Sequence, residues 1–125
     1  MPSIALTKDT FTNTINNSEI VLVDWWADWC GPCKAFAPTF EQKSDEHSDI
    51  VFAKVDTEAE QELSQLAQIT SIPTLMAFRE GILLFSQAGA LPTTALEELI
   101  QAVKGLNMDQ VKAEIERQRQ DDLQK

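Results

Sequence analysis

Apolar and polar residues occur along this chain in blocks that predict a regular succession of strands and helices. Two almost unbroken apolar runs, Ile20–Ala27 and Ile50–Val55, have the pattern of strands that are covered on both faces of a sheet. Helices are indicated where apolar residues recur every three or four positions, or where a capping residue precedes such a segment. The predicted strands are Ser3–Leu6, Ile20–Ala27, Ile50–Val55, Thr74–Arg79 and Ile82–Ala88, and the predicted helices run from a cap at Asp9 or Thr10 through Ile15, then over Cys30–His47, Ala59–Ala67 and Thr93–Lys104.

The order of these elements places the chain in the α/β class. Strands that are separated by helices favour parallel crossovers, whereas Glu80–Gly81 has the sequence of a tight turn in an antiparallel hairpin. We therefore expect a mixed central sheet of about five strands, flanked by about four helices. Gly105 is expected to cap the last helix, because glycine is common just past a helix C-terminus.

Residues 106–125 have a different composition from the rest of the chain. They carry nine charged side chains in 20 positions, with a thin apolar stripe of Met108, Val111 and Ile115 at helical spacing. We expect one domain over residues 1–105, followed by a charged extension that is helical in part or disordered. A solvated extension and a segment that docks on the domain or on a partner both remain open.

Length, charge and hydropathy exclude several classes of protein. A chain of 125 residues with 43% hydrophobic residues suits a single domain with a real core. The net charge of −10 disfavours binding to nucleic acids and to anionic membrane surfaces. No apolar run approaches the roughly 20 residues that span a membrane, and residues 1–10 lack the pattern of a signal peptide. We therefore expect a cytoplasmic protein.

The two cysteines of the chain, Cys30 and Cys33, directly follow the first long apolar strand. Structural disulfides are rare in the cytoplasm, so this pair points to chemistry. Residues three positions apart share one face of a helix, which permits a disulfide, and the short loop it closes contributes little stability. The start of a helix favours a thiolate on Cys30. We predict that Cys30 attacks a disulfide of another protein and that Cys33 resolves the mixed disulfide.

The cysteine pair has three other interpretations. A structural zinc site usually takes four ligands, and His47 is the single histidine that could join the two cysteines, so we expect no metal. A structural disulfide is disfavoured by the short spacing and by a reducing compartment. Two inert buried thiols are not excluded by spacing alone, although Gly31-Pro32 between them argues against that interpretation.

The segment Val23–Lys34, with the sequence VDWWADWCGPCK, resembles the active-site signature of the thioredoxin family. Ser71-Ile72-Pro73-Thr74 resembles the cis-proline loop of that family, and Gly89-Ala90 matches its third loop on the substrate side. The likeness extends over about residues 4–104, with every element in the family's order. It implies a thioredoxin-like fold and the activity of a protein-disulfide reductase.

The resemblance also implies roles for individual residues. Asp24 would be a buried proton acceptor for Cys33, and Lys54 matches a family lysine near that aspartate. Burial in an apolar strand would raise the pKa of Asp24, whereas an aspartate at a strand end that points to water is the alternative from the residues alone. Pro73 would follow a cis peptide bond. The implied substrate surface consists of Trp29, Gly31, Pro32, Ile72, Pro73, Gly89 and Ala90.

We expect no bound cofactor, because the chain contains no glycine-rich phosphate motif. The resemblance implies that electrons come from an NADPH-dependent thioredoxin reductase and pass to disulfide-containing proteins, with the chain acting as a monomer. A disulfide oxidase or isomerase is one alternative, and a scaffold without redox turnover is another. Gly31-Pro32 lacks the histidine that oxidising relatives typically carry in its second position, and the intact Asp24 argues against a scaffold.

Overall fold

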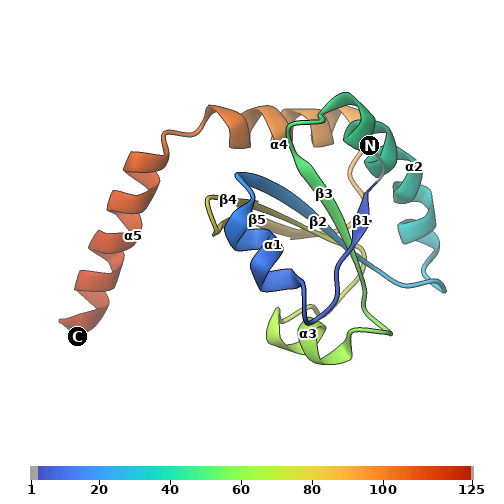
Figure 1. Cartoon of the computed structure of the whole chain (residues 1–125), viewed down its shortest axis with the longest axis horizontal. Coiled ribbons are helices and arrows are strands. Elements are labelled where there is room, and N and C mark those ends of the chain that lie inside the picture. The colour runs from blue at the N-terminus through green and yellow to red at the C-terminus, as the bar shows by residue number, and fades with distance from the viewer. Residues whose placement is uncertain (1–2, 125) are drawn as a thin grey trace.

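The computed structural model describes residues 3–124, in which helices cover both faces of a mixed five-stranded sheet (Figure 1). The strands are β1 (Ile4–Ala5), β2 (Ile20–Trp26), β3 (Val51–Asp56), β4 (Thr74–Arg79) and β5 (Ile82–Ala88). The helices are α1 (Phe11–Asn17), α2 (Gly31–Glu46), α3 (Gln61–Leu66), α4 (Thr93–Gly105) and α5 (Met108–Leu123). The predicted α/β class, mixed sheet and order of elements are confirmed, with most boundaries shifted by one or two residues.

The strands lie in the order β1-β3-β2-β4-β5, which places β2 at the centre of the sheet. β2 runs parallel to β3 and antiparallel to β4, so it is hydrogen-bonded along both edges. This position explains the unbroken apolar run, because both faces of a central strand are covered by helices. It also brings Asp24 of β2 into register with Lys54 of β3 on one side and with Leu75 of β4 on the other.

One expectation about strand direction is wrong. A helix lies between β3 and β4, which favours a parallel crossover, but β4 runs antiparallel to β2 and therefore also to β3. The connecting helix α3 has six residues and spans about 9 Å, whereas a six-residue strand spans about 20 Å. The chain therefore stays at the end of the sheet where β3 finishes. β4 starts at that same end and runs back in the opposite direction.

The predicted hairpin between β4 and β5 is confirmed at the expected residues. Glu80 has φ 53° and Gly81 has φ 79°, so both central residues of the turn are in the left-handed region. Two left-handed residues are typical of a type I′ turn, whose twist matches that of the flanking strands.

The expected glycine cap of α4 is wrong. Gly105 is the last residue of α4, and Leu106 in extended conformation caps the helix. Carbonyl groups at the end of α4 receive hydrogen bonds from the guanidinium of Arg79 instead. Its Nη1 donates to the carbonyl oxygens of Val103, Lys104 and Leu106 at 2.9, 3.1 and 3.0 Å. With these carbonyls satisfied by a side chain, the helix end does not need a left-handed glycine.

Two apolar clusters hold the layers together. On one face of the sheet, side chains of β2 and β3 pack against Phe36 and Phe40 of α2 and Leu96 and Ile100 of α4. On the other face, the alternate side chains of these strands pack against α1 and α3. Since side chains alternate along a strand, Asp24 lies on the face that α2 covers, as does Leu22.

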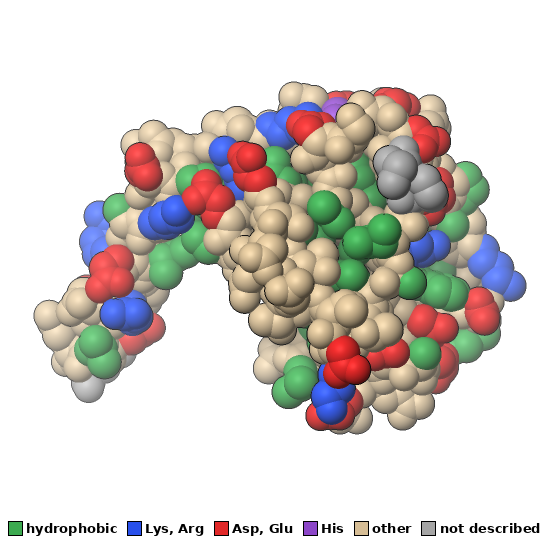
Figure 2. All heavy atoms as spheres, in the orientation of Figure 1, with side chains coloured by type: hydrophobic (Ala, Val, Ile, Leu, Met, Phe, Trp, Pro, Cys, Tyr) green, Lys and Arg blue, Asp and Glu red, His purple; other side chains and the backbone are tan. Residues whose placement is uncertain are grey.

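The extension beyond α4 is helical as far as it is described. Asn107 caps α5 by accepting a hydrogen bond from the main-chain N–H of Gln110, and Met108 is only 7% exposed. Lys112 forms an ion pair with Glu80 of the hairpin at 2.5 Å. The rest of α5 projects away from the domain (Figure 1), and Figure 2 shows an open gap between this helix and the body of the domain. The base of this gap is a groove of about 370 Å³ between β5 and the first turns of α5.

None of the helices in the described part of the chain is both long and apolar enough to cross a membrane.

Candidate functional site

The cysteine pair lies where β2 gives way to α2. The main-chain N–H of Cys30 donates to the carbonyl oxygen of Ala27 at 3.2 Å, and Cys30 is the N-cap residue of α2. Its sulfur accepts a hydrogen bond from the main-chain N–H of Cys33 at 3.1 Å. The two sulfur atoms form a disulfide, with the Cα atoms 5.2 Å apart. A thiolate at this position would be stabilised by the same N–H group and by the positive end of the helix dipole.

The two sulfur-bearing residues face different spaces. Cys30 lines an open groove of about 590 Å³, whereas Cys33 lines a smaller cavity of about 100 Å³. Cys33 lies one turn further into α2, yet the exposed fractions are nearly equal, at 4% for Cys30 and 3% for Cys33. The distinction between the two cysteines is thus the space that each one faces.

All the described residues that line the groove beside Cys30 are uncharged, although 24% of the chain is charged. Four residues of the expected substrate surface line it, namely Trp29, Gly31, Pro32 and Ile72. Sequence reasoning missed its remaining wall, which consists of Thr57, Gln61, Ser64, Gln65, Ile69, Thr70 and Ser71. The only signal in the sequence is the spacing of Gln61 and Gln65 on one face of α3, which is equally typical of a solvated surface.

The loop before β4 has the cis peptide bond that the resemblance implies, between Ile72 and Pro73. The carbonyl oxygen of Ile72 lies 3.8 Å from the sulfur of Cys30. The carbonyl oxygen of Pro73 accepts a 2.8 Å hydrogen bond from the main-chain N–H of Gly89, which has φ 107°. Gly89 is thus held against the loop, but Pro73, Gly89 and Ala90 are not part of the groove lining.

Asp24 lies in the interior, as the resemblance implies, with 1% of the residue exposed. Within the described chain, neither of its carboxylate oxygens has a hydrogen-bond partner. Burial raises the pKa of Asp24 to about 7, since removal from water disfavours the charged form. The ammonium of Lys54 opposes that shift and the carboxylate of Glu41 adds to it. A carboxyl group with a pKa near 7 can accept a proton at neutral pH.

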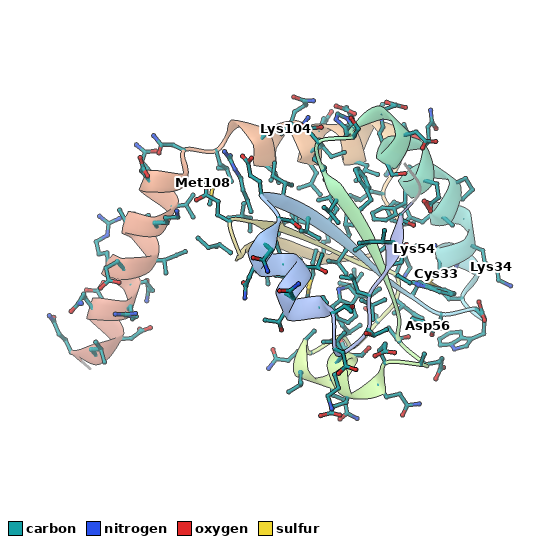
Figure 3. All side chains as sticks on the ribbon, in the orientation of Figure 1. Cys33, Lys34, Lys54, Asp56, Lys104 and Met108 are labelled. Atoms are coloured by element: carbon teal, nitrogen blue, oxygen red, sulfur yellow. A yellow bond between two sulfur atoms is a disulfide. The ribbon has the colours of Figure 1, made fainter. Side chains whose placement is uncertain are left out.

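Lys54 lies on the same side of the sheet as Cys33, at the cavity of about 100 Å³ (Figure 3). This cavity is lined by Trp26, Ala27, Asp28, Cys33, Lys34, Ala37 and Lys54. The Lys54 ammonium lies 5.0 Å from the centre of the Trp26 ring, a distance typical of a cation–π contact. The structure therefore brings three of the four expected catalytic residues, Asp24, Cys33 and Lys54, to the face of the sheet beneath α2.

Two glutamates and one histidine form the one candidate metal cluster in the part of the chain that the structure describes. Ligand atoms of Glu46, His47 and Glu97 lie within 4.8 Å of one another. The ammonium of Lys43 already lies 2.9 Å from Glu46 Oε1 and 3.0 Å from Glu97 Oε1, and His47 Nε2 is 2.8 Å from Glu97 Oε1. The positive charge of Lys43 thus offsets the negative charges of the two glutamates. The contacts among these side chains link the end of α2 to α4.

Comparison with known proteins shows which family shares these features. The family model described as Thioredoxin matches residues 2–102. A protein of Streptomyces coelicolor named putative thioredoxin 2 is 50% identical over 116 residues, which is 93% of this chain and 87% of that protein. The thioredoxin of Coprinus comatus is 38% identical over 103 residues, covering 81% of this chain and 96% of its own length.

Solved structures agree with the sequence matches. A thioredoxin from Plasmodium falciparum superposes with a TM-score of 0.74 at 36% identity, over 80% of this chain and 97% of its own. A mutant thioredoxin from Halobacterium salinarum gives a TM-score of 0.77 at 29% identity, over 85% of this chain and 93% of its own. The arrangement of strands and helices is therefore that of a thioredoxin-like fold.

Proposed function

The chain belongs to the thioredoxin family and is a thiol-disulfide oxidoreductase with the features of a disulfide reductase, and we propose that Cys30 attacks while Cys33 resolves. The observation that carries this assignment is the placement of Cys30 at the open groove and of Cys33 at the separate, smaller cavity. A substrate disulfide that enters the groove meets Cys30 first.

The reaction proceeds in two exchanges that pass two electrons to the substrate. The Cys30 thiolate attacks one sulfur of the substrate disulfide, forms a mixed disulfide and releases the other substrate sulfur as a thiolate. Cys33 loses its proton to Asp24, directly or through water, and its thiolate attacks the sulfur of Cys30. The Cys30–Cys33 disulfide forms, and the second substrate sulfur leaves as a thiolate.

The substrate segment is proposed to bind in extended form along the groove, next to the main chain of Ile72. The carbonyl oxygen of Ile72 lies 3.8 Å from the sulfur of Cys30, and in this proposal it accepts a hydrogen bond from the added strand. Trp29, Gly31 and Pro32 supply apolar contact around the attacking sulfur. Pro73, Gly89 and Ala90 are proposed to complete this surface once a substrate extends beyond the groove.

Membership of the family implies disulfide-containing substrates and a reductase partner in general. We assign the re-reduction of the disulfide to an NADPH-dependent thioredoxin reductase, and we place the protein in the cytoplasm as a monomer. Residues 1–105 are proposed to contain everything that the chemistry needs, because no residue of α5 lines the groove beside Cys30 or the cavity beside Cys33.

Reduction of insulin in the presence of dithiothreitol tests the proposed function. The chain is expected to accelerate the precipitation of the insulin B chain, and Cys30→Ser is expected to abolish the acceleration. Lys34→Gln serves as a surface control, because it changes a charge beside the site and leaves both sulfurs in place. An acceleration that persists in Cys30→Ser would contradict the assignment of the nucleophile.

A further inference from the structure

The side chains of Asp24 and Lys54 lie on neighbouring strands in direct register, yet they do not form an ion pair. The two Cα positions are partners in the parallel β2–β3 ladder, so both side chains leave the sheet on the same face. A buried carboxylate next to a lysine normally takes the ammonium as a partner, because the pair offsets the cost of removing each charge from water. Here both oxygens of Asp24 lack a partner among the described residues.

The partner that Lys54 does have is the ring of Trp26. The ammonium lies 5.0 Å from the ring centre, and both residues line the cavity that Cys33 also faces. Trp26 is two positions after Asp24 in β2, and therefore points to the same face of the sheet. Its face attracts a cation through the ring quadrupole, and this attraction is larger where water is excluded.

We propose that Trp26 is a positioning residue that holds the Lys54 ammonium over its indole ring and off the Asp24 carboxylate, which keeps Asp24 free to accept the proton of Cys33. This inference rests on the proposed role of Asp24 as proton acceptor. Lys54 thus acts on Asp24 from a distance as a nearby positive charge. Direct contact would lower the proton affinity of Asp24 much further.

The other groups near Asp24 do not supply a second positive charge that would lower its proton affinity. From α2, Glu41 raises the pKa of Asp24, while Lys34 and Cys33 line the neighbouring cavity. From the loop before α2, Asp28 lines the same cavity, and β4 presents the uncharged Leu75 at the position in register with Asp24. Among the described residues, Lys54 is the one cation that shifts the pKa of Asp24, so its position matters most for the proton affinity.

A four-protein cycle tests the proposal by carboxyl-carbon NMR titration of Asp24 in the oxidised state, in which Cys33 does not titrate. The proteins are the wild type, Trp26→Leu, Lys54→Met and the double variant. Without the ring, Lys54 is free to contact Asp24, so Trp26→Leu should lower the pKa of Asp24 by about half a unit to one unit. In the Lys54→Met background the same change should shift that pKa by less than about 0.3 units.

Two results would overturn the proposal. If Trp26→Leu lowers the pKa of Asp24 equally in both backgrounds, the ring acts by excluding water and not through Lys54. If Trp26→Leu raises that pKa, the ring holds Lys54 near the carboxylate and not away from it. Trp26→Phe keeps a weaker ring face and should give a smaller shift with the same dependence on Lys54. Should Trp26→Leu fail to fold, Trp26→Phe in both backgrounds completes the same cycle.

The titration needs no substrate, so it separates this inference from the proposed function. A chain that fails to reduce insulin while its cycle depends on Lys54 would refute the function and leave the positioning role intact. If the chain reduces insulin but Trp26→Leu shifts the pKa of Asp24 equally with and without Lys54, the proposed function holds and the positioning role of Trp26 is refuted. The pH profile of insulin reduction supplies a second readout, because Trp26→Phe should move its acidic limb to lower pH only when Lys54 is present.

Discussion

The indole N–H of Trp29 donates a 2.7 Å hydrogen bond to Oε1 of Glu58, although Trp29 is 70% exposed. The bond joins the loop before α2 to the segment that connects β3 with α3, and these two segments border the same groove. An exposed tryptophan without such a partner would sample several rotamers, so the bond fixes the ring at the rim of the groove.

Removal of this acceptor should weaken the binding of protein substrates. Glu58→Ala is expected to raise the KM for insulin by up to about threefold with little change in kcat, because an exposed hydrogen bond contributes only modestly. Glu58→Gln keeps an oxygen acceptor and should stay close to the wild type. Equal KM values for the wild type and Glu58→Ala would show that the position of the ring does not matter for binding.

The raised pKa of Asp24 makes stability depend on pH. Its folded pKa of about 7 lies above the ordinary value of 3.8, so the folded state binds the proton more tightly than the unfolded chain. The associated stability is fully present below about pH 4 and is lost as the pH rises through about 7. Asp24→Asn, which stays neutral, should therefore be more stable than the wild type at pH 8, by up to about 4 kcal/mol.

Urea unfolding at pH 4 and pH 8 measures this effect. The advantage of Asp24→Asn should nearly disappear at pH 4, where the wild-type carboxyl is protonated in the folded protein. A difference of equal size at both pH values would mean that Asp24 does not titrate as its burial requires. The same variant should reduce insulin more slowly at pH 7, because an amide does not accept the proton of Cys33.

Arg79 is expected to stabilise the C-terminus of α4 and the link to α5. Its Nη1 serves three carbonyl oxygens, and its side chain is only 16% exposed. Arg79→Ala leaves two partly buried carbonyl oxygens and one exposed one without their side-chain donor, and should lower the free energy of unfolding by about 1–2 kcal/mol in urea. Arg79→Lys keeps one ammonium donor and should recover part of the loss. An Arg79→Ala variant as stable as the wild type would show that water satisfies this helix end.

Helix α5 should be held to the domain by its first turn. Met108 is 7% exposed and Ile115 is 46% exposed, although both belong to the apolar stripe of the helix. Met108→Ala is expected to lower the free energy of unfolding by about 2 kcal/mol or more, whereas Ile115→Ala should change it by less than about 0.5 kcal/mol. Similar losses in the two variants would indicate that α5 packs along its whole length.

Local sequence patterns were enough to predict the elements that depend on near neighbours. The apolar run of β2 identifies a central strand, and Glu80-Gly81 identifies the hairpin turn because a glycine is favoured at a left-handed position. The cysteine pair is predicted at a helix start because Pro32 is favoured in the first helical turn. The roles of Cys30 and Cys33 were predicted from their spacing at a helix start, those of the other site residues came from the resemblance, and all of them remain predictions.

Features that depend on distant segments could not be predicted in this way. Arg79 caps a helix about 25 residues away, so the sequence around Gly105 carries no sign of it. The side chain of His47 is only 12% exposed, because it contacts Glu97 and Lys104 of α4, and the sequence around His47 does not indicate these partners. The wall of the groove that α3 contributes could likewise not be predicted, since polar residues such as Gln61 and Gln65 are common on any exposed helix.

The assignment of Cys30 as the attacking cysteine and Cys33 as the resolving cysteine is tested most directly by mass spectrometry of a trapped intermediate. Reduced Cys33→Ser is mixed with a disulfide-containing protein, thiols are blocked at acidic pH, and the cross-linked peptides are identified. The account predicts a stable mixed disulfide on Cys30 in Cys33→Ser and little or none in the matched variant Cys30→Ser. A mixed disulfide that accumulates on Cys33 in Cys30→Ser, to the same extent as on Cys30 in Cys33→Ser, would contradict it.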